Sequence, residues 1–166
     1  MGKLTIAMIL VISCAALGFW RASLLGIKVS RAKAMIVMVD KIQSCLRYER
    51  LTTAQLIETI SRLDSLAVLP HLGVCCKSME EGNPFPKAWS DSVKLAGYTE
   101  EEKQILLQVG EILGSTDAQN QISTLSMLRE FMTQCQKEAE KERNEKGKLY
   151  HSLGILGGIG LAILIW

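Results

Sequence analysis

The sequence predicts an all-α protein, an antiparallel bundle of about six helices that is tethered by a transmembrane helix at each end. Apolar residues recur three and four positions apart through the middle of the chain, and no alternating strand pattern of useful length appears there. The stretches Leu4–Trp20 and Leu149–Trp166 contain no Asp, Glu, Lys or Arg, whereas every such residue except Lys3 lies between them. This layout is expected to hold a polar segment against a membrane.

Three parts follow from these patterns. Residues 1–27 are expected to form the first transmembrane helix with its flank, residues 28–148 the helical bundle, and residues 149–166 the second transmembrane helix. At about 1.5 Å of rise per residue, the two uncharged stretches span roughly 25 Å and 27 Å, which is short but workable for a hydrocarbon core of about 30 Å. Trp20 and Trp166 suit interfacial positions.

Basic residues near the two uncharged stretches indicate the orientation. Arg21 and Lys28 follow the first stretch, and Lys146 and Lys148 precede the second, whereas Lys3 alone lies on the other side. The positive-inside rule therefore predicts a two-span protein of the cell membrane, with the bundle in the cytoplasm and both termini on the outer side.

A lipoprotein signal is the alternative reading of the N-terminal stretch. Lys3, a short apolar run and Val11-Ile12-Ser13-Cys14 resemble such a signal, in which Cys14 would be acylated after cleavage. Residues 15–20 stay apolar, however, where a lipoprotein normally has a polar tether, and translocation would carry the basic residues to the wrong side. We therefore favour an uncleaved helix, and a plain signal peptide is disfavoured for the same reasons.

Small residues in both stretches predict close packing of membrane helices. Small side chains let helix backbones approach each other where lipid supplies no hydrophobic drive. They recur four positions apart at Cys14, Gly18 and Ala22, and again at Gly154, Gly158 and Ala162.

Within the bundle, apolar stripes at helical spacing define the expected helices. The first two stripes are Met35, Met38, Ile42, Cys45 and Leu46, and then Leu56, Ile60, Leu63 and Ala67.

Local signals mark the later helices. After the break at Gly82-Asn83-Pro84, a short helix is expected to bury Phe85, Trp89 and Val93. Thr99 with Glu102 three residues later predicts a capping box at the start of the next helix. A last helix is expected to run from Ala118 without interruption into the second membrane segment.

Several function classes are disfavoured by the composition. The net charge is only +2, and no patch is basic enough to indicate nucleic-acid binding. The five Cys form no C-x-x-C pair and are expected to be reduced. Phosphate-binding, nucleophile-elbow and dinucleotide motifs do not occur, and His71 and His151 are the only histidines. We therefore expect no catalytic residues, no cofactor and no metal.

The run Leu113-Gly114-Ser115-Thr116-Asp117, with Gln121 four residues after the Asp, resembles the Leu-Gly-x-x-Asp-x-x-x-Gln motif of the stage III sporulation protein AB family. The charged helix that leads to Ser152–Gly158 and the Ala88-Trp89 pair also resemble that family, as does Tyr48 in the first inter-helix turn. One departure is that Glu49–Thr53 replaces the Gly and Thr-Pro-Leu that the family tends to place after this Tyr.

The resemblance implies a role in endospore formation, in the complex that the mother-cell membrane builds around the engulfed forespore. The family is similar to the platform proteins of type II secretion and type IV pilus systems. The implied partners are a cytoplasmic secretion-type ATPase and the other membrane components of the complex, and a homo-oligomer stays open. A membrane-anchored helical adaptor or sensor that is unrelated to export is the alternative function.

If the chain is such a platform, the turns at the end of the bundle farthest from the membrane are the expected contact with the motor. The residues at these turns are Arg47, Arg50, Gly114, Asp117 and Gln121.

Overall fold

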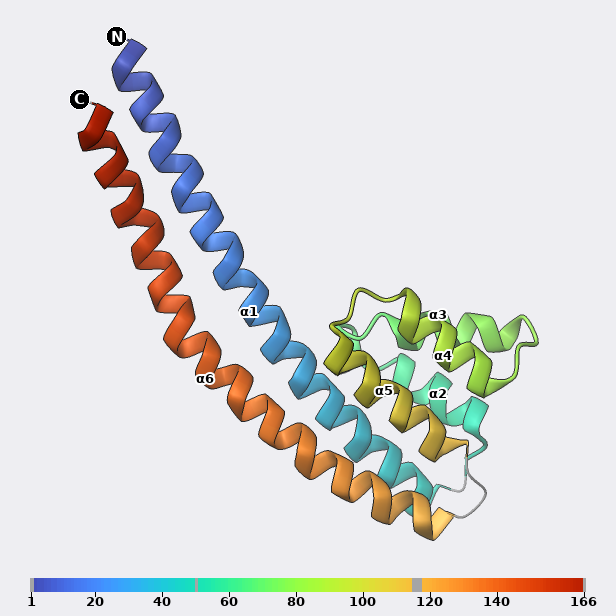
Figure 1. Cartoon of the computed structure of the whole chain (residues 1–166). Coiled ribbons are helices and arrows are strands. Elements are labelled where there is room, and N and C mark those ends of the chain that lie inside the picture. The colour runs from blue at the N-terminus through green and yellow to red at the C-terminus, as the bar shows by residue number, and fades with distance from the viewer. Residues whose placement is uncertain (1, 50, 115–117, 166) are drawn as a thin grey trace. The chain divides into compact units, whose positions relative to one another are not determined.

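A computed structural model describes the backbone of residues 2–49, 51–114 and 118–165, together with most side chains between residues 23 and 146. The six α-helices are α1 (Gly2–Tyr48), α2 (Thr53–Ser61), α3 (His71–Glu80), α4 (Phe85–Leu95), α5 (Glu100–Leu113) and α6 (Ala118–Ile165), and a short 3₁₀ helix, η1, covers Asp64–Leu66 (Figure 1). No strand occurs in these ranges, so the predicted all-α class is confirmed. The last helix is continuous, as the sequence predicted.

The chain divides into two compact units. Unit 1 consists of Met1–Ser30 and Cys135–Trp166, and unit 2 of Arg31–Gln134, so each unit holds part of α1 and part of α6. In unit 1, Lys28 Nζ lies 3.4 Å from Glu142 Oε2, which joins α1 to α6, and Glu142 also pairs with Lys146 one turn later at 2.7 Å.

The predicted membrane spans are not confirmed. Among the residues that the structure describes, no helix has an apolar stretch long enough to cross a bilayer. Many side chains of Leu4–Trp20 and Leu149–Trp166 lie outside the described set. The two transmembrane helices, and the boundaries at residues 27 and 149, therefore stay predictions.

Within unit 2, α1 and α6 are held in register by polar side chains. Gln43 Nε2 donates hydrogen bonds to the Ile122 carbonyl at 3.1 Å and to Ser126 Oγ at 2.9 Å. Further along the helices, Arg129 donates two hydrogen bonds to the Asp40 carboxylate. The first predicted stripe lies inside this unit, where Met38 and Ile42 are fully buried.

The second predicted stripe was wrong at its end. It was expected to continue to Ala67, but α2 ends at Ser61 and Ala67 is exposed. Leu63 has extended backbone angles (φ −79°, ψ 121°), which breaks the helical period before η1 begins. Leu66 and Leu69 are buried instead, because the reoriented chain turns their side chains into the core.

The capping box of α5 is confirmed and also connects α5 to α1. Thr99 Oγ1 accepts a hydrogen bond from the Glu102 N–H at 3.3 Å, and Glu102 Oε2 accepts one from the Thr99 N–H at 2.8 Å. The same carboxylate lies 3.5 Å from Nη1 of Arg31 on α1. A local helix-start signal therefore fixes the position of α5 against another helix.

Candidate functional site

The predicted partner-interface residues are only partly described. Arg47 is exposed near the end of α1, and Gly114 is exposed as the C-cap of α5. Arg50 and Asp117 lie outside the described residues. Gln121 is buried, with 7% of its surface exposed, so it lies beneath the surface on which the motif had placed it. The role of these positions in partner binding stays a prediction.

The small residues predicted to pack membrane helices have no described side chains. Cys14, Gly18 and Ala22 lie on α1, and the second set of Gly154, Gly158 and Ala162 lies on α6. Their predicted packing therefore falls outside what the structure describes.

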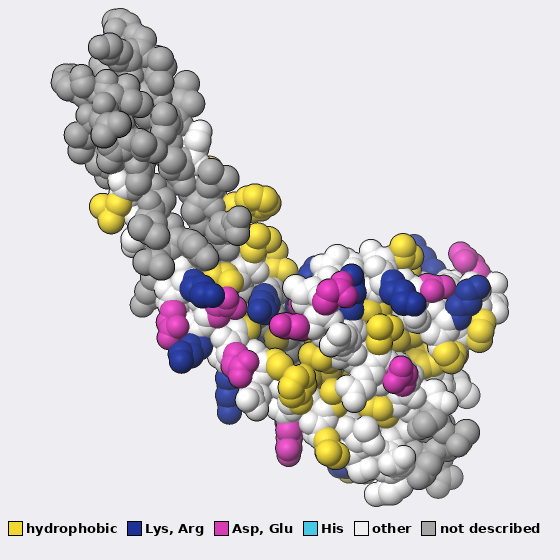
Figure 2. All heavy atoms as spheres, in the orientation of Figure 1, with side chains coloured by type: hydrophobic (Ala, Val, Ile, Leu, Met, Phe, Trp, Pro, Cys, Tyr) yellow, Lys and Arg dark blue, Asp and Glu magenta, His cyan; other side chains and the backbone are white. Residues whose placement is uncertain are grey.

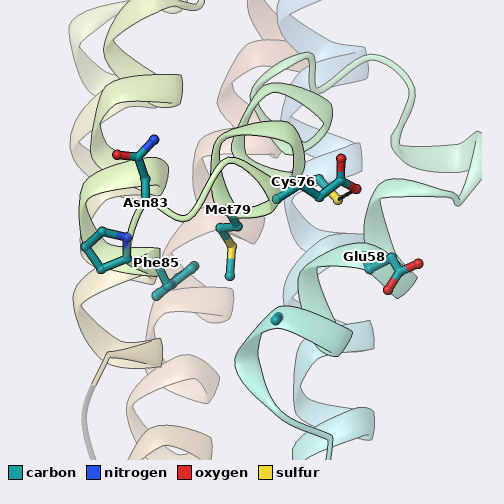
Figure 3. Close-up of a pocket in the computed structure, with 8 residues that line it drawn as sticks. Glu58, Cys76, Met79, Asn83 and Phe85 are labelled. Carbon is teal, nitrogen blue, oxygen red and sulfur yellow. Dashed lines mark hydrogen bonds between the residues drawn. The ribbon is translucent and has the colours of Figure 1, made fainter.

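A groove that the sequence did not predict lies between α2, α3 and the start of α4 (Figure 3). It has a volume of about 380 Å³ and is open to solvent, and its lining residues are Ala54, Glu58, Cys76, Met79, Glu80, Asn83, Pro84 and Phe85. We call it the α2–α3 groove. Met79 and Phe85 lie next to each other at its centre in Figure 3, so its floor is apolar.

The turn between α3 and α4 shapes one wall of the α2–α3 groove. Gly82 has φ +91°, a backbone conformation that favours glycine. Asn83 then folds back, because its backbone N–H donates to the Ser78 carbonyl at 3.1 Å and its Nδ2 donates to Ser78 Oγ at 3.2 Å. Pro84 is the N-cap of α4, and Phe85, the first residue of that helix, lies next to Met79.

The charged groups of the α2–α3 groove are both acidic. Glu58 pairs with Arg62 one turn along α2 at 2.5 Å, and both side chains are largely exposed. Glu80 accepts a long hydrogen bond from the Cys76 thiol at 3.7 Å and forms no ion pair with another described residue. Burial, together with the nearby Glu80 carboxylate, raises the pKa of Cys76, so this thiol stays protonated and weakly nucleophilic near neutral pH.

A second groove runs between α4 and α5. It has a volume of about 610 Å³, and its lining residues are Pro86, Trp89, Ser90, Lys94, Leu107, Gly110, Glu111 and Gly114. We call it the α4–α5 groove. It carries one basic and one acidic side chain, and it includes Gly114 from the predicted interface. Figure 2 shows hydrophobic side chains over this part of unit 2.

Trp89 forms the floor of the α4–α5 groove and is the centre of the core. Its ring is 1% exposed, and Nε1 donates a hydrogen bond to the Leu106 carbonyl at 2.7 Å. A Cβ atom at Gly110 would lie 2.3 Å from Trp89 Cδ1. Only glycine therefore lets the indole approach α5 closely enough to reach a helix carbonyl.

His71 is buried against this tryptophan. The two rings meet edge to face at 4.9 Å, and His71 Nδ1 lies 2.7 Å from the Tyr98 hydroxyl. Burial lowers the pKa of His71 to about 4, so the imidazole is neutral near pH 7. Nε2 of the same ring is buried without a hydrogen-bond partner. Burial of an unpaired polar group lowers the stability of the fold.

Arg31 holds the loop that carries Tyr98. Its guanidinium lies 4.9 Å from the Tyr98 ring centroid, and Nη1 donates to the Gly97 carbonyl at 2.8 Å. Together with the contact to Glu102, these interactions connect α1 to the start of α5. Nothing in the sequence indicated that His71 pairs with Tyr98, because the two residues are 27 positions apart and no local spacing connects them.

Among the residues that the structure describes, no group of three His, Cys, Asp or Glu side chains is placed to hold a metal ion. Cys45, Cys75, Cys76 and Cys135 are free thiols, and the first two are buried.

Comparison with protein families identifies the chain. The family model for stage III sporulation protein AB matches residues 3–166. The chain belongs to this family. The resemblance of the Leu113–Gln121 and C-terminal regions is therefore confirmed over the full length of the match, and membership indicates a sporulation-specific role. No curated protein and no solved structure matches the chain.

Proposed function

We propose that this protein is a non-enzymatic membrane component of the secretion-like complex between mother cell and forespore. In this role it acts as a platform that couples a cytoplasmic secretion-type ATPase to the membrane assembly. Family membership supports the sporulation role. The similarity of that family to secretion platform proteins supports the coupling to an ATPase.

The observation that carries the membrane part of this proposal is the set of large apolar side chains exposed on α1 within unit 1. Phe19 is 70% exposed and Trp20 is 61% exposed, and Ile12 is also exposed. Large exposed apolar side chains are unfavourable in water when they gather on one surface, and such surfaces are typical of membrane or protein contact. The absence of charge from Leu4 to Trp20 and from Leu149 to Trp166 supports the same conclusion.

The proposed topology places both termini on the outer side of the mother-cell membrane and unit 2 in the cytoplasm. The test introduces a thiol at an exposed position of α5, Glu101→Cys, in the full chain. A membrane-impermeant maleimide should label this site only after the cells are permeabilised. The same labelling of the parent chain is the control, because Cys76 and Cys135 are partly accessible. Labelling of the new thiol in intact cells would reverse the proposed orientation.

The proposed coupling is tested by measuring the affinity of the full chain, in detergent micelles, for the purified cognate ATPase. We expect saturable binding that weakens as salt is raised, because charged surfaces contribute to such contacts. Arg47→Glu changes an exposed residue of the predicted interface and should reduce the affinity without altering the helix content. A wild-type chain that does not bind would remove the ATPase from the proposal.

A further inference from the structure

The α2–α3 groove combines an apolar floor with charged side chains that are all acidic. Its floor is formed by Met79 and Phe85, and its rim carries Glu58 and Glu80. No Lys or Arg lines it, whereas the α4–α5 groove contains Lys94 beside Glu111. The α2–α3 groove is therefore complementary to a positive charge, and the α4–α5 groove is less so.

Its two carboxylates differ in their availability. Glu58 already pairs with Arg62, but an exposed pair of this kind on one helix contributes only about 0.3–0.5 kcal/mol and is readily exchanged. Glu80 is exposed and accepts only the weak thiol hydrogen bond from Cys76. An incoming cation can therefore bind Glu80 without first displacing another cation.

The floor can adapt to an apolar side chain. Met79 is partly buried, and its unbranched thioether can change rotamer at little cost. Phe85 is 8% exposed and is fixed by its contact with Trp89, at 5.6 Å between ring centroids. A flexible residue beside a rigid one gives a surface that accepts an apolar group without reorganising the core.

The concave surface continues across α2. A neighbouring hollow of about 370 Å³ shares Glu58 with the α2–α3 groove, and its other lining residues are Leu51, Gln55, Thr59 and Arg62. Leu51 directly follows the predicted interface residue Arg50 in the sequence. Together the two hollows are lined by more side chains than a single ion would contact.

We propose that the α2–α3 groove binds a protein segment that presents a Lys or Arg side chain beside an apolar side chain. The cation pairs with Glu80, with Glu58 as a second acceptor, and the apolar side chain packs on Met79 and Phe85. We assign this segment to the ATPase, and this assignment rests on the proposed function. Phosphate-bearing ligands are disfavoured because the carboxylates repel them.

The test compares two groove variants with a matched control in the affinity assay for the purified ATPase, using the full chain in detergent micelles. Glu80→Arg reverses the charge at the rim, and Ala54→Phe fills the groove from an exposed position of α2. Glu111→Arg makes the same charge change in the α4–α5 groove. Circular dichroism and thermal melting check that all three variants fold like the wild type.

Both groove variants should weaken binding by about tenfold or more, and Glu111→Arg should leave the affinity within about twofold. Wild-type-like affinity in both groove variants would overturn the assignment of the groove while leaving the ATPase partnership standing. An equal loss in Glu111→Arg would also overturn it, because the effect would then be one of overall charge. Absence of binding by the wild-type chain would overturn the partnership, and the groove assignment with it.

Discussion

The helices of unit 2 are joined in two different ways. On α1 and α6, the described buried apolar side chains of unit 2 are unbranched or aliphatic, such as Met38 and Met132, and polar side chains join the two helices. Where α3, α4 and α5 meet, the core is built from aromatic rings, among them His71, Trp89 and Tyr98. All the buried aromatic rings of the described residues lie between positions 71 and 98.

The difference has a physical consequence. An aliphatic, methionine-containing contact can repack after small changes, because unbranched side chains adopt alternative rotamers. The aromatic contact depends on a missing Cβ at Gly110 and on one indole hydrogen bond, so few substitutions can fit it. We therefore expect α3, α4 and α5 to act as a rigid body, and the α1–α6 contact to tolerate change.

The largest expected effect comes from Trp89→Ala in a fragment of residues 30–145, which contains unit 2 and which we expect to fold without the two uncharged stretches. Loss of the buried ring leaves a cavity and removes the hydrogen bond to the Leu106 carbonyl. The free energy of unfolding should therefore fall by about 3–5 kcal/mol. Met38→Leu is the matched control in the other region, where a volume-conserving change should cost less than about 1.5 kcal/mol. Urea unfolding followed by circular dichroism measures both.

Similar losses of unfolding free energy in Trp89→Ala and Met38→Leu would mean that the aromatic and aliphatic contacts do not differ in their tolerance of substitution. A Trp89→Ala fragment that folds as stably as the wild type would show that the indole is dispensable for the core.

A pH-dependent effect of intermediate size is expected from His71. Its pKa is about 4 in the folded chain and near 6.5 when unfolded, so between these values the unfolded state binds more protons. The contribution of neutral His71 to the free energy of unfolding should therefore be fully present above about pH 6.5. It should be lost as the pH is lowered toward 4, which lowers the stability by up to about 3 kcal/mol. Below pH 4 this contribution does not change further.

His71→Phe isolates this effect, because all other titratable groups of the fragment are unchanged. The variant leaves the Tyr98 hydroxyl unpaired and should lose about 1–3 kcal/mol at pH 7, but its stability should fall less steeply below pH 6.5. The measurement is the urea midpoint of both fragments at several pH values. Parallel curves would mean that His71 does not carry the pH dependence.

The parts of the fold that sequence predicted well depend on neighbouring residues. The capping box at Thr99 and Glu102 and the turn at Gly82-Asn83-Pro84 each contain their cause within four residues. The burial of Trp89 followed from its place on an apolar helical face.

The parts that were missed depend on residues far apart in the chain. The α2–α3 groove needs two helices and the turn before a third to come together, and the pairing of His71 with Tyr98 crosses α4. Gln121 was placed on the surface because a motif shows which residue occurs but not which way its side chain points. The end of α2 was missed because Leu63 fits an apolar stripe while its backbone is extended.

The smallest expected effect tests the tolerance of the α1–α6 contact. Asp40 and Arg129 form a two-bond ion pair, but their side chains are 46% and 41% exposed. Exposed pairs contribute about 0–1 kcal/mol and are screened by salt, so Arg129→Ala should lower stability only slightly, and less at high salt. A double-mutant cycle with Asp40→Ala, measured by urea unfolding, gives the coupling directly. A coupling of several kcal/mol that persists at high salt would contradict this expectation. The α1–α6 contact would then tolerate substitution as poorly as the aromatic contact, because the register of α1 against α6 would depend on a single pair of side chains.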